Sequence, residues 1–87
     1  MIEKYREAVE IIREASTKLG IDPAPALKEL DNMPVVFAKN RMSKTLAGVA
    51  IMLAYKDLRP VKVAYAVGMA KSALVSALKA YKKAPKG

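Results

Sequence analysis

The segment from residue 63 to residue 78, VAYAVGMAKSALVSAL, sets the strongest limit on how this chain can fold. Its apolar residues recur at steps of three and four, as on one face of a helix, and Gly68 inside such a helix would cost only about 1 kcal/mol. A single helix would be one wall of a bundle. Two helices that meet at Gly68 would instead form a helix-turn-helix, a unit that many nucleic-acid-binding proteins use.

The spacing around Gly68 favours two helices. In a helix-turn-helix the first helix needs a small residue where the second crosses it, and the turn needs a glycine that can adopt a positive φ. Ala64 and Gly68, four residues apart, meet these needs, and Pro60 separates the unit from the preceding helix. Apolar residues fall on the predicted inward positions: Val63, Val67, Met69, Leu74 and Ala77. We therefore predict a turn at Gly68 and a last helix that begins near Lys71.

Glycine and proline divide the preceding chain into further helices. The first is amphipathic and ends at Gly20. Its predicted inward stripe consists of Ile2, Tyr5, Val9, Ile12 and Leu19. A shorter helix covers residues 23–31, with Asp22 as its cap. Residues 34–40, PVVFAKN, fit either a short helix or a buried extended segment, and we favour the helix.

Residues 44–57 are predicted to form the central helix, because they are apolar nearly all round. Ser43 stands in the position of an N-cap, and Gly48 would let another helix approach closely. The expected fold class is therefore all-α. We expect a single five-helix orthogonal bundle over residues 1–83 that ends in a helix-turn-helix, followed by a basic tail at residues 84–87.

Charge is distributed unevenly along the chain, whose net charge is +8. Residues 1–33 hold five basic against seven acidic residues, a net charge of −2, whereas residues 34–87 hold eleven basic residues against Asp57 alone, a net charge of +10. Basic residues can simply keep a small domain soluble. An excess confined to one half is more typical of a protein whose C-terminal part faces a polyanion.

The composition argues against an enzyme. The chain has neither cysteine nor histidine, so thiolate and imidazole ligands, cysteine nucleophiles and histidine acid-base chemistry are missing. Four glutamates follow the spacing of a solvated helix face, which we favour over a catalytic pair: Glu3, Glu7, Glu10 and Glu14. We expect no enzymatic activity, no cofactor and no metal.

The chain carries no segment that predicts export or membrane insertion. A charged helical pattern follows Met1 directly, and the longest uncharged stretch, residues 45–55, is shorter than the roughly 20 residues of a spanning helix. We expect a cytoplasmic protein, associated with the nucleoid or part of a virion. The lack of glutamine and the presence of only two asparagines favour a thermophilic source.

Three segments resemble the cyclin-like repeat of archaeal transcription factor B and its eukaryotic counterpart, factor IIB. RMSKTLAGVAIMLAY, residues 41–55, resembles the central helix of that repeat, with an Arg, a helix cap and an Ala-rich apolar run in order. IIREASTKLGI, residues 11–21, is similar to its first helix, and VKVAYAVGMAKSALVSAL, residues 61–78, is similar to its final helix-turn-helix. The resemblance covers most of the chain. It implies a five-helix, cyclin-like repeat whose last helix touches promoter DNA beside the TATA element.

The chain departs from that family in two respects. The family also has an N-terminal zinc ribbon and a second repeat, for which these residues have neither zinc ligands nor room, so we do not expect polymerase recruitment by the same route. The family also shows Arg and Asn on its recognition helix, and neither residue occurs between positions 60 and 87 here. Lysine and serine hold phosphates but discriminate poorly between bases. Binding should therefore be sensitive to salt and only weakly selective for sequence.

The predicted partner is double-stranded DNA, bound mainly through phosphates. The outward face of the last helix also includes Val75, and positive charge at the start of the helix at residues 44–57 suggests an anionic partner. The predicted DNA-binding residues are Lys62, Lys71, Ser72, Ser76, Lys79, Lys82, Lys83, Arg41 and Lys44. Six lysine–phosphate contacts would give a slope of log K against log[salt] of about −5. Lys82, Lys83 and Lys86 could equally complement the dipole of the last helix.

Other functions remain open from the sequence. The acidic first helix would face away from DNA and could contact a protein partner or a second copy of the chain. One alternative is a structural nucleoprotein, of chromatin or a virion, that packages DNA by stacking subunits. Another is a membrane-surface protein with snorkelling lysines, although we expect no membrane partner.

Overall fold

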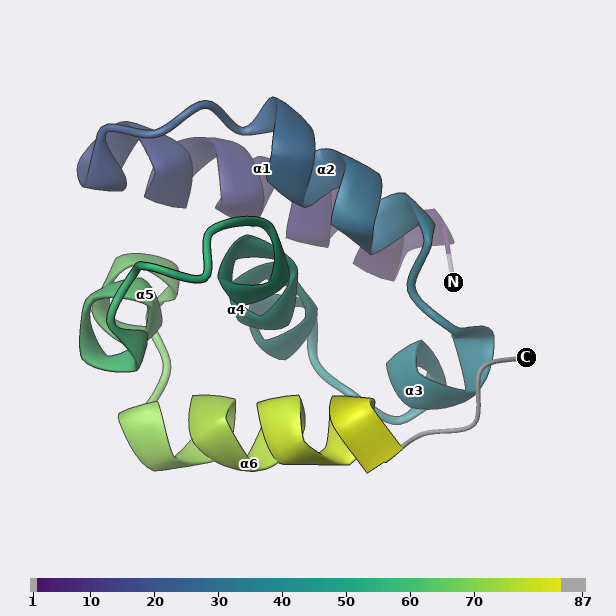
Figure 1. Ribbon diagram of the computed structural model, residues 1–87. Coiled ribbons are helices and arrows are strands. Elements are labelled where there is room, and N and C mark those ends of the chain that lie inside the picture. Colours follow the sequence, from purple (N-terminus) through teal and green to yellow (C-terminus); the bar gives the residue numbers. More distant parts are fainter. Residues whose placement is uncertain (1, 84–87) are drawn as a thin grey trace.

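Six helices make up the secondary structure of the computed structural model, which describes residues 2–83 (Figure 1). They are α1 (Ile2–Leu19), α2 (Ala24–Asp31), α3 (Val35–Lys39), α4 (Ser43–Ala54), α5 (Pro60–Val67) and α6 (Lys71–Lys83). The all-α prediction is confirmed, with six helices where a five-helix bundle was predicted; the short helix favoured for residues 34–40 forms as α3 after Pro34. The predicted basic tail, residues 84–87, lies outside the described residues.

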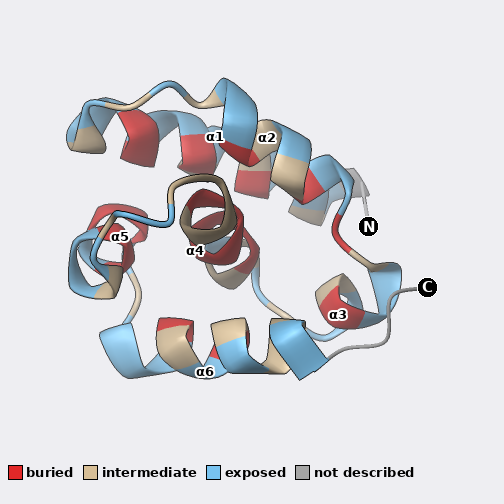
Figure 2. Ribbon diagram, viewed as in Figure 1, coloured by how far each residue is buried: buried red, intermediate tan, exposed pale blue. Residues whose placement is uncertain are grey.

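Helix α4 lies in the centre of the molecule, as its apolar sequence predicts. It contacts α1 and α2 on one side and α5 and α6 on the other (Figure 1). Every residue from Leu46 to Ile51 is buried, so that almost the whole circumference of the helix is covered (Figure 2). The other helices therefore present their apolar faces to α4 and their polar faces outward.

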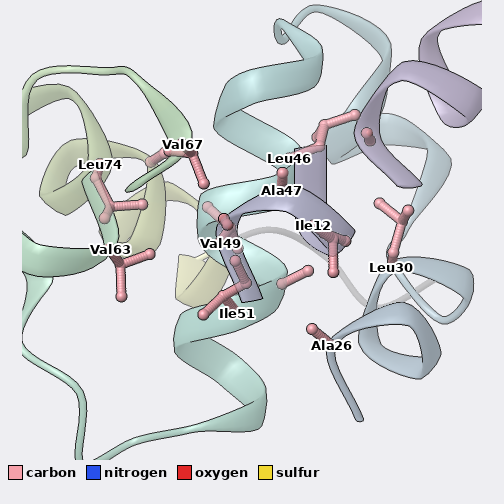
Figure 3. Packing of buried hydrophobic residues seen from close by; sticks show 14 of the residues in the cluster. Ile12, Ala26, Leu30, Leu46, Ala47, Val49, Ile51, Val63, Val67 and Leu74 are labelled. Carbon is pink, nitrogen blue, oxygen red and sulfur yellow. The ribbon is translucent and has the colours of Figure 1, made fainter. Parts of the chain in front are cut away.

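The predicted close approach at Gly48 is confirmed. A Cβ atom at this position would lie 2.9 Å from Leu74 Cδ1 and 3.3 Å from Met69 Sδ. Figure 3 shows Leu74 together with Val63 and Val67 on the side of α4 that faces α5 and α6. The missing side chain at Gly48 thus lets α6 and the turn before it pack directly on the α4 backbone.

The predicted end of α1 at Gly20 is confirmed, whereas Asp22 is not the N-cap residue of α2, because Pro23 holds that position. Gly20 has a φ of 70°, and the amide of Ile21 donates a hydrogen bond to the carbonyl of Ser16 at 3.0 Å, which closes the last turn of α1. The carboxylate of Asp22 accepts a hydrogen bond from the amide of Ala24 at 3.0 Å. Helix α2 begins at Ala24, one residue later than predicted.

Two predictions about α4 are wrong. Ser43 does not cap the helix: α4 begins at Ser43 itself, Met42 is the N-cap residue, and no side chain makes a capping hydrogen bond. The helix also ends at Ala54 and not at residue 57, because Tyr55 adopts a non-helical conformation with φ −126° and ψ 82°. Its hydroxyl donates to the carbonyl of Asp22 at 2.7 Å, which ties the end of α4 to the start of α2.

The buried face of α1 agrees only in part with the predicted stripe: Ile12 lies in the core and Val9 and Leu19 pack against it, but Tyr5 does not. Ala8, Ile12 and Ala15 are fully buried, whereas Tyr5 is 42% exposed. Alanine fits where α1 crosses α4 closely, so Ala8 and Ala15 join Ile12 of the predicted stripe at this contact. The Tyr5 hydroxyl donates instead to the carboxylate of Asp31 on α2, and this hydrogen bond raises the pKa of Tyr5. The predicted solvated face is confirmed, since all four glutamates of α1 are exposed.

Candidate nucleic-acid interface

The chain turns a corner at Gly68, as the spacing predicts. Gly68 has φ 83° and ψ 42°, a left-handed conformation that glycine adopts without a steric penalty. The amides of Gly68 and Met69 both donate to the carbonyl of Ala64 at 2.9 Å and close the end of α5. Helices α5 and α6 meet at 108°, within the range of a helix-turn-helix. The single-helix interpretation of this segment is therefore wrong.

Apolar residues on both helices hold the corner in place. Val63 and Leu74 are fully buried, and Val67 and Ala77 are nearly so. Met69 is half-buried in the turn, close to Gly48. These are the predicted inward positions, so the corner is anchored on α4 and the orientation of α6 is fixed by packing.

The opposite face of α6 is open to solvent. Its exposed polar side chains are all lysine or serine: Lys71, Ser72, Ser76, Lys79, Lys82 and Lys83. Val75 lies among them and is half-buried. No acidic residue occurs after Asp57. In Figure 2, α6 lies at the edge of the molecule across α4 from α1 and α2, and much of it is coloured as exposed. We call these six lysine and serine residues the α6 face.

Lys44 joins this region from a distant part of the sequence. Its Nζ atom lies 3.7 Å from the position that a Cβ atom would occupy at Gly68. Lys44 is exposed and belongs to the first turn of α4. The structure therefore places its ammonium group at the turn that precedes α6, which supports the inclusion of Lys44 among the predicted residues.

Lys62 points to a different surface. It is exposed on α5 and lines a groove of about 620 Å³ together with Lys18 and Leu19 of α1. We predicted that Lys62 binds DNA together with the lysines of α6 because α5 and α6 both belong to the basic half of the chain. The structure does not bring Lys62 into the α6 face.

Arg41 has partners within the protein. Its Nη1 donates to the carbonyl of Phe37 at 3.1 Å, and its guanidinium carbon lies 4.2 Å from the centroid of the Phe37 ring. The ring of Phe37 also packs edge-to-face with the ring of Tyr81 in α6. The two ring centroids are 5.1 Å apart, and the interplanar angle is 89°. Phe37 therefore joins α3 to the end of α6, and Arg41 packs on Phe37.

Sequence reasoning missed a basic residue near the end of α6. Lys56, just after α4, lines a cavity of about 370 Å³ together with Lys82, Met52, Leu53 and Leu78. Nothing in the local sequence indicates that Lys56 and Lys82 share a surface, because their proximity depends on how α6 crosses α4. Lys56 thus extends the basic surface beyond the α6 face.

Within residues 2–83, no group of three or more acidic side chains is arranged to hold a metal ion. No single helix in that range is long and apolar enough to cross a membrane; α5 and α6 satisfy length and composition only as a bent pair. No family model matches the chain, and no curated protein and no solved structure matches it.

Proposed function

We propose that this protein binds duplex DNA through the helix-turn-helix formed by α5 and α6. The observation that carries the proposal is the α6 face, on which every exposed polar side chain is a lysine or a serine. A recognition helix needs one face anchored on the domain and the other free for the groove. Leu74 and Ala77 anchor α6, and the α6 face is free.

Phosphate neutralisation is the proposed mechanism. Lys71 and Lys79 lie on the α6 face, and Lys44 stands beside the turn at Gly68, so that ammonium groups from two helices would meet the backbone of one duplex. Ser72 and Ser76 are short enough to let α6 approach the floor of the groove. Arg41 contributes mainly by packing on Phe37 of α3, and Lys62 faces the groove beside α1.

Weak sequence selectivity follows from the same side chains. Arg, Asn and Gln, which form paired hydrogen bonds with base edges, are absent from the sequence of α6. Contacts from lysine and serine to phosphates position the protein on the DNA backbone but carry little information about the base sequence. A cyclin-like bundle, as in transcription factors B and IIB, fits the corner and the central α4, and we keep a role in transcription as part of the proposal.

The glutamates of α1 would face away from bound DNA. Helices α1 and α6 lie on opposite sides of α4 (Figure 1), and the four glutamates are exposed. Repulsion between these carboxylates and phosphates would favour the orientation in which α6 meets the duplex. The side that carries α1 then remains free for a protein partner or a second copy of the chain.

A mobility-shift assay on random and TATA-containing duplexes across a salt series tests the proposal. Five lysines, Lys44 and the four on the α6 face, predict a slope of log K against log[salt] of about −4.5. Affinities for the two duplexes should agree within about tenfold, given the lack of base-reading side chains. No retention at about 50 mM salt would contradict DNA binding, and strong preference for the TATA duplex would contradict the phosphate mechanism.

A structural nucleoprotein is the second candidate, favoured by one observation. Val35, Val36 and Met42 are 61%, 66% and 70% exposed around α3 and form apolar surface that a neighbouring subunit could cover. Stoichiometry in the same assay separates the candidates: many copies per duplex with filaments indicate packaging, whereas one or two copies indicate a regulator. A membrane-surface role has less support, because α6 would have to withdraw Leu74 and Ala77 from the core.

A further inference from the structure

A second surface of the molecule combines exposed apolar residues with positive charge. A groove of about 620 Å³ runs between the end of α1, the loop before α5, and α5 itself. Its apolar lining includes Leu19, Leu58, Val61 and Tyr65. We call it the α1–α5 groove. The groove lies on α5 and α1 and is distinct from the α6 face, so a ligand could bind there whether or not α6 binds DNA.

The apolar side chains of the groove are unusually accessible. Tyr65 is 86% exposed and Val61 is 53% exposed, although both belong to a helix whose other apolar residues are buried. A tyrosine supplies a large contact area at a low entropic cost, and aromatic residues are enriched at protein–protein contacts. Val61 and Tyr65 are one helical turn apart, so they present a continuous strip to solvent.

The charged residues that line the groove are both lysines, and they come from different helices. Lys18 belongs to α1 and Lys62 to α5, so positive charge borders the apolar strip on two sides. An apolar strip between two ammonium groups complements a segment in which apolar side chains alternate with carboxylates. It does not suit a phosphate backbone, which offers no apolar counterpart for Val61 and Tyr65.

We propose that the α1–α5 groove binds a short acidic amphipathic helix of a partner protein. The apolar residues of that helix would pack on Leu58, Val61 and Tyr65, and its flanking carboxylates would pair with Lys18 and Lys62. This is the helix-in-groove mode, in which apolar residues at steps of three and four supply affinity and charges at the rim set partner choice.

A second copy of the chain does not provide such a helix. The acidic stripe of α1, Glu3 to Glu14, is flanked by Arg6 and Arg13. Between residues 3 and 19 of α1, Tyr5 is the one large apolar side chain that is well exposed. The other large apolar residues exposed outside the groove, Val35, Val36 and Met42, lie on α3 or just before α4 and are not accompanied by a row of carboxylates. The proposed occupant is therefore a different protein.

Three fluorescein-labelled peptides of about 16 residues, or about four helical turns, test the proposal by anisotropy. The first has Leu and Phe on one helical face and Glu or Asp elsewhere. The second keeps the apolar face but carries Lys in place of every acid, and the third keeps the composition of the first with its apolar residues scattered. We expect micromolar to submillimolar binding of the first alone, as for a small transient contact. Amide chemical-shift changes should centre on Leu19, Val61 and Tyr65.

Variants of exposed residues separate the groove from other surfaces. Val61→Ser with Tyr65→Ser should weaken the first peptide about tenfold or more, and Lys18→Glu should do the same. Val35→Ser with Val36→Ser is the matched control and should leave peptide binding unchanged. Lys71→Glu with Lys79→Glu should also leave peptide binding unchanged, because those lysines belong to the α6 face. The peptide result therefore stands or falls separately from the DNA-binding assay.

Several outcomes would overturn the proposal. Equal binding of the first and third peptides would mean that charge alone drives association. No binding of the first peptide at about 1 mM, a free energy weaker than about −4 kcal/mol, would mean that the groove is not a docking site for acidic helices. Shift changes centred on α6 would place the contact elsewhere, and sedimentation showing a dimer that buries Tyr65 would assign the groove to a second copy.

Discussion

Leu74 of α6 and Gly48 of α4 lie so close that a Cβ atom on Gly48 would stand 2.9 Å from the Leu74 Cδ1 methyl group. Leu74 is fully buried, and Met69 Sδ approaches the same point at 3.3 Å. This contact joins the central helix to the helix that carries the α6 face. The position of the proposed DNA-binding surface thus depends on a glycine in another helix.

Side chains at residue 48 should therefore destabilise the protein according to their size. Gly48→Val should lower the free energy of unfolding by about 2 kcal/mol or more, because it overpacks a buried contact. Gly48→Ala should cost less, since its gain in helix propensity of about 1 kcal/mol offsets part of the clash. Urea unfolding followed by circular dichroism measures both. Equal stability of Gly48→Val and the unmodified protein would show that α6 does not pack on α4 as described.

Substitution at Gly68 should cost stability for a different reason. The position has φ 83°, and a Cβ atom there would meet Lys44 Nζ only at an ordinary 3.7 Å, so the cost is conformational and not steric. Gly68→Ala should lose about 1 to 2 kcal/mol, the penalty of the left-handed region. Gly68→Asn should lose less, because asparagine tolerates that region. Thermal unfolding of the two variants checks this order, and a reversed order would argue against the turn.

Arg41 tests whether a predicted DNA contact is mainly structural. Arg41→Ala removes the stacking on Phe37 and the hydrogen bond to its carbonyl, so we expect a loss of stability of about 1 kcal/mol. Its effect on DNA affinity should be smaller than that of Lys71→Ala. Arg13→Ala, an exposed change on α1, is the control and should alter stability by less than about 0.5 kcal/mol. A larger loss of DNA affinity for Arg41→Ala than for Lys71→Ala would show that Arg41 belongs to the DNA-binding surface.

The sequence predicted those features that depend on local chemistry. The turn at Gly68, the end of α1 at Gly20 and the break before Pro60 follow from residues that restrict or permit particular backbone angles. The central position of α4 follows from its apolar run. Apolar residues lie nearly all round this helix, so packing on one side alone could not bury them. The solvent-facing side of α6 follows from helical periodicity once the corner at Gly68 is accepted.

Features that depend on distant residues were not predictable. Ser43 does not act as a cap because Met42 holds the N-cap position, and Tyr5 turns to Asp31 because small residues of α1 already fill the contact with α4. Lys4 donates from α1 to the carbonyls of Ala38 and Lys39 at 3.2 and 3.1 Å, which only the fold could reveal. The α1–α5 groove likewise combines residues from separate helices.

Charge reversal on the α6 face tests the central claim most directly. Lys71→Glu with Lys79→Glu changes two exposed side chains, so the fold should be retained, as circular dichroism and urea unfolding will show. The matched control is Lys18→Glu with Lys28→Glu, which makes the same change in net charge on exposed residues of α1 and α2.

The measurement is how well the folded double variants retain a random duplex at about 100 mM salt. A random duplex is used because phosphate contacts dominate its affinity. We predict that the Lys71 and Lys79 variant loses retention, while the Lys18 and Lys28 variant retains the duplex with only a modest decrease in affinity. Equal retention by the two folded variants would contradict the account, because DNA would then respond to total charge and not to the α6 face.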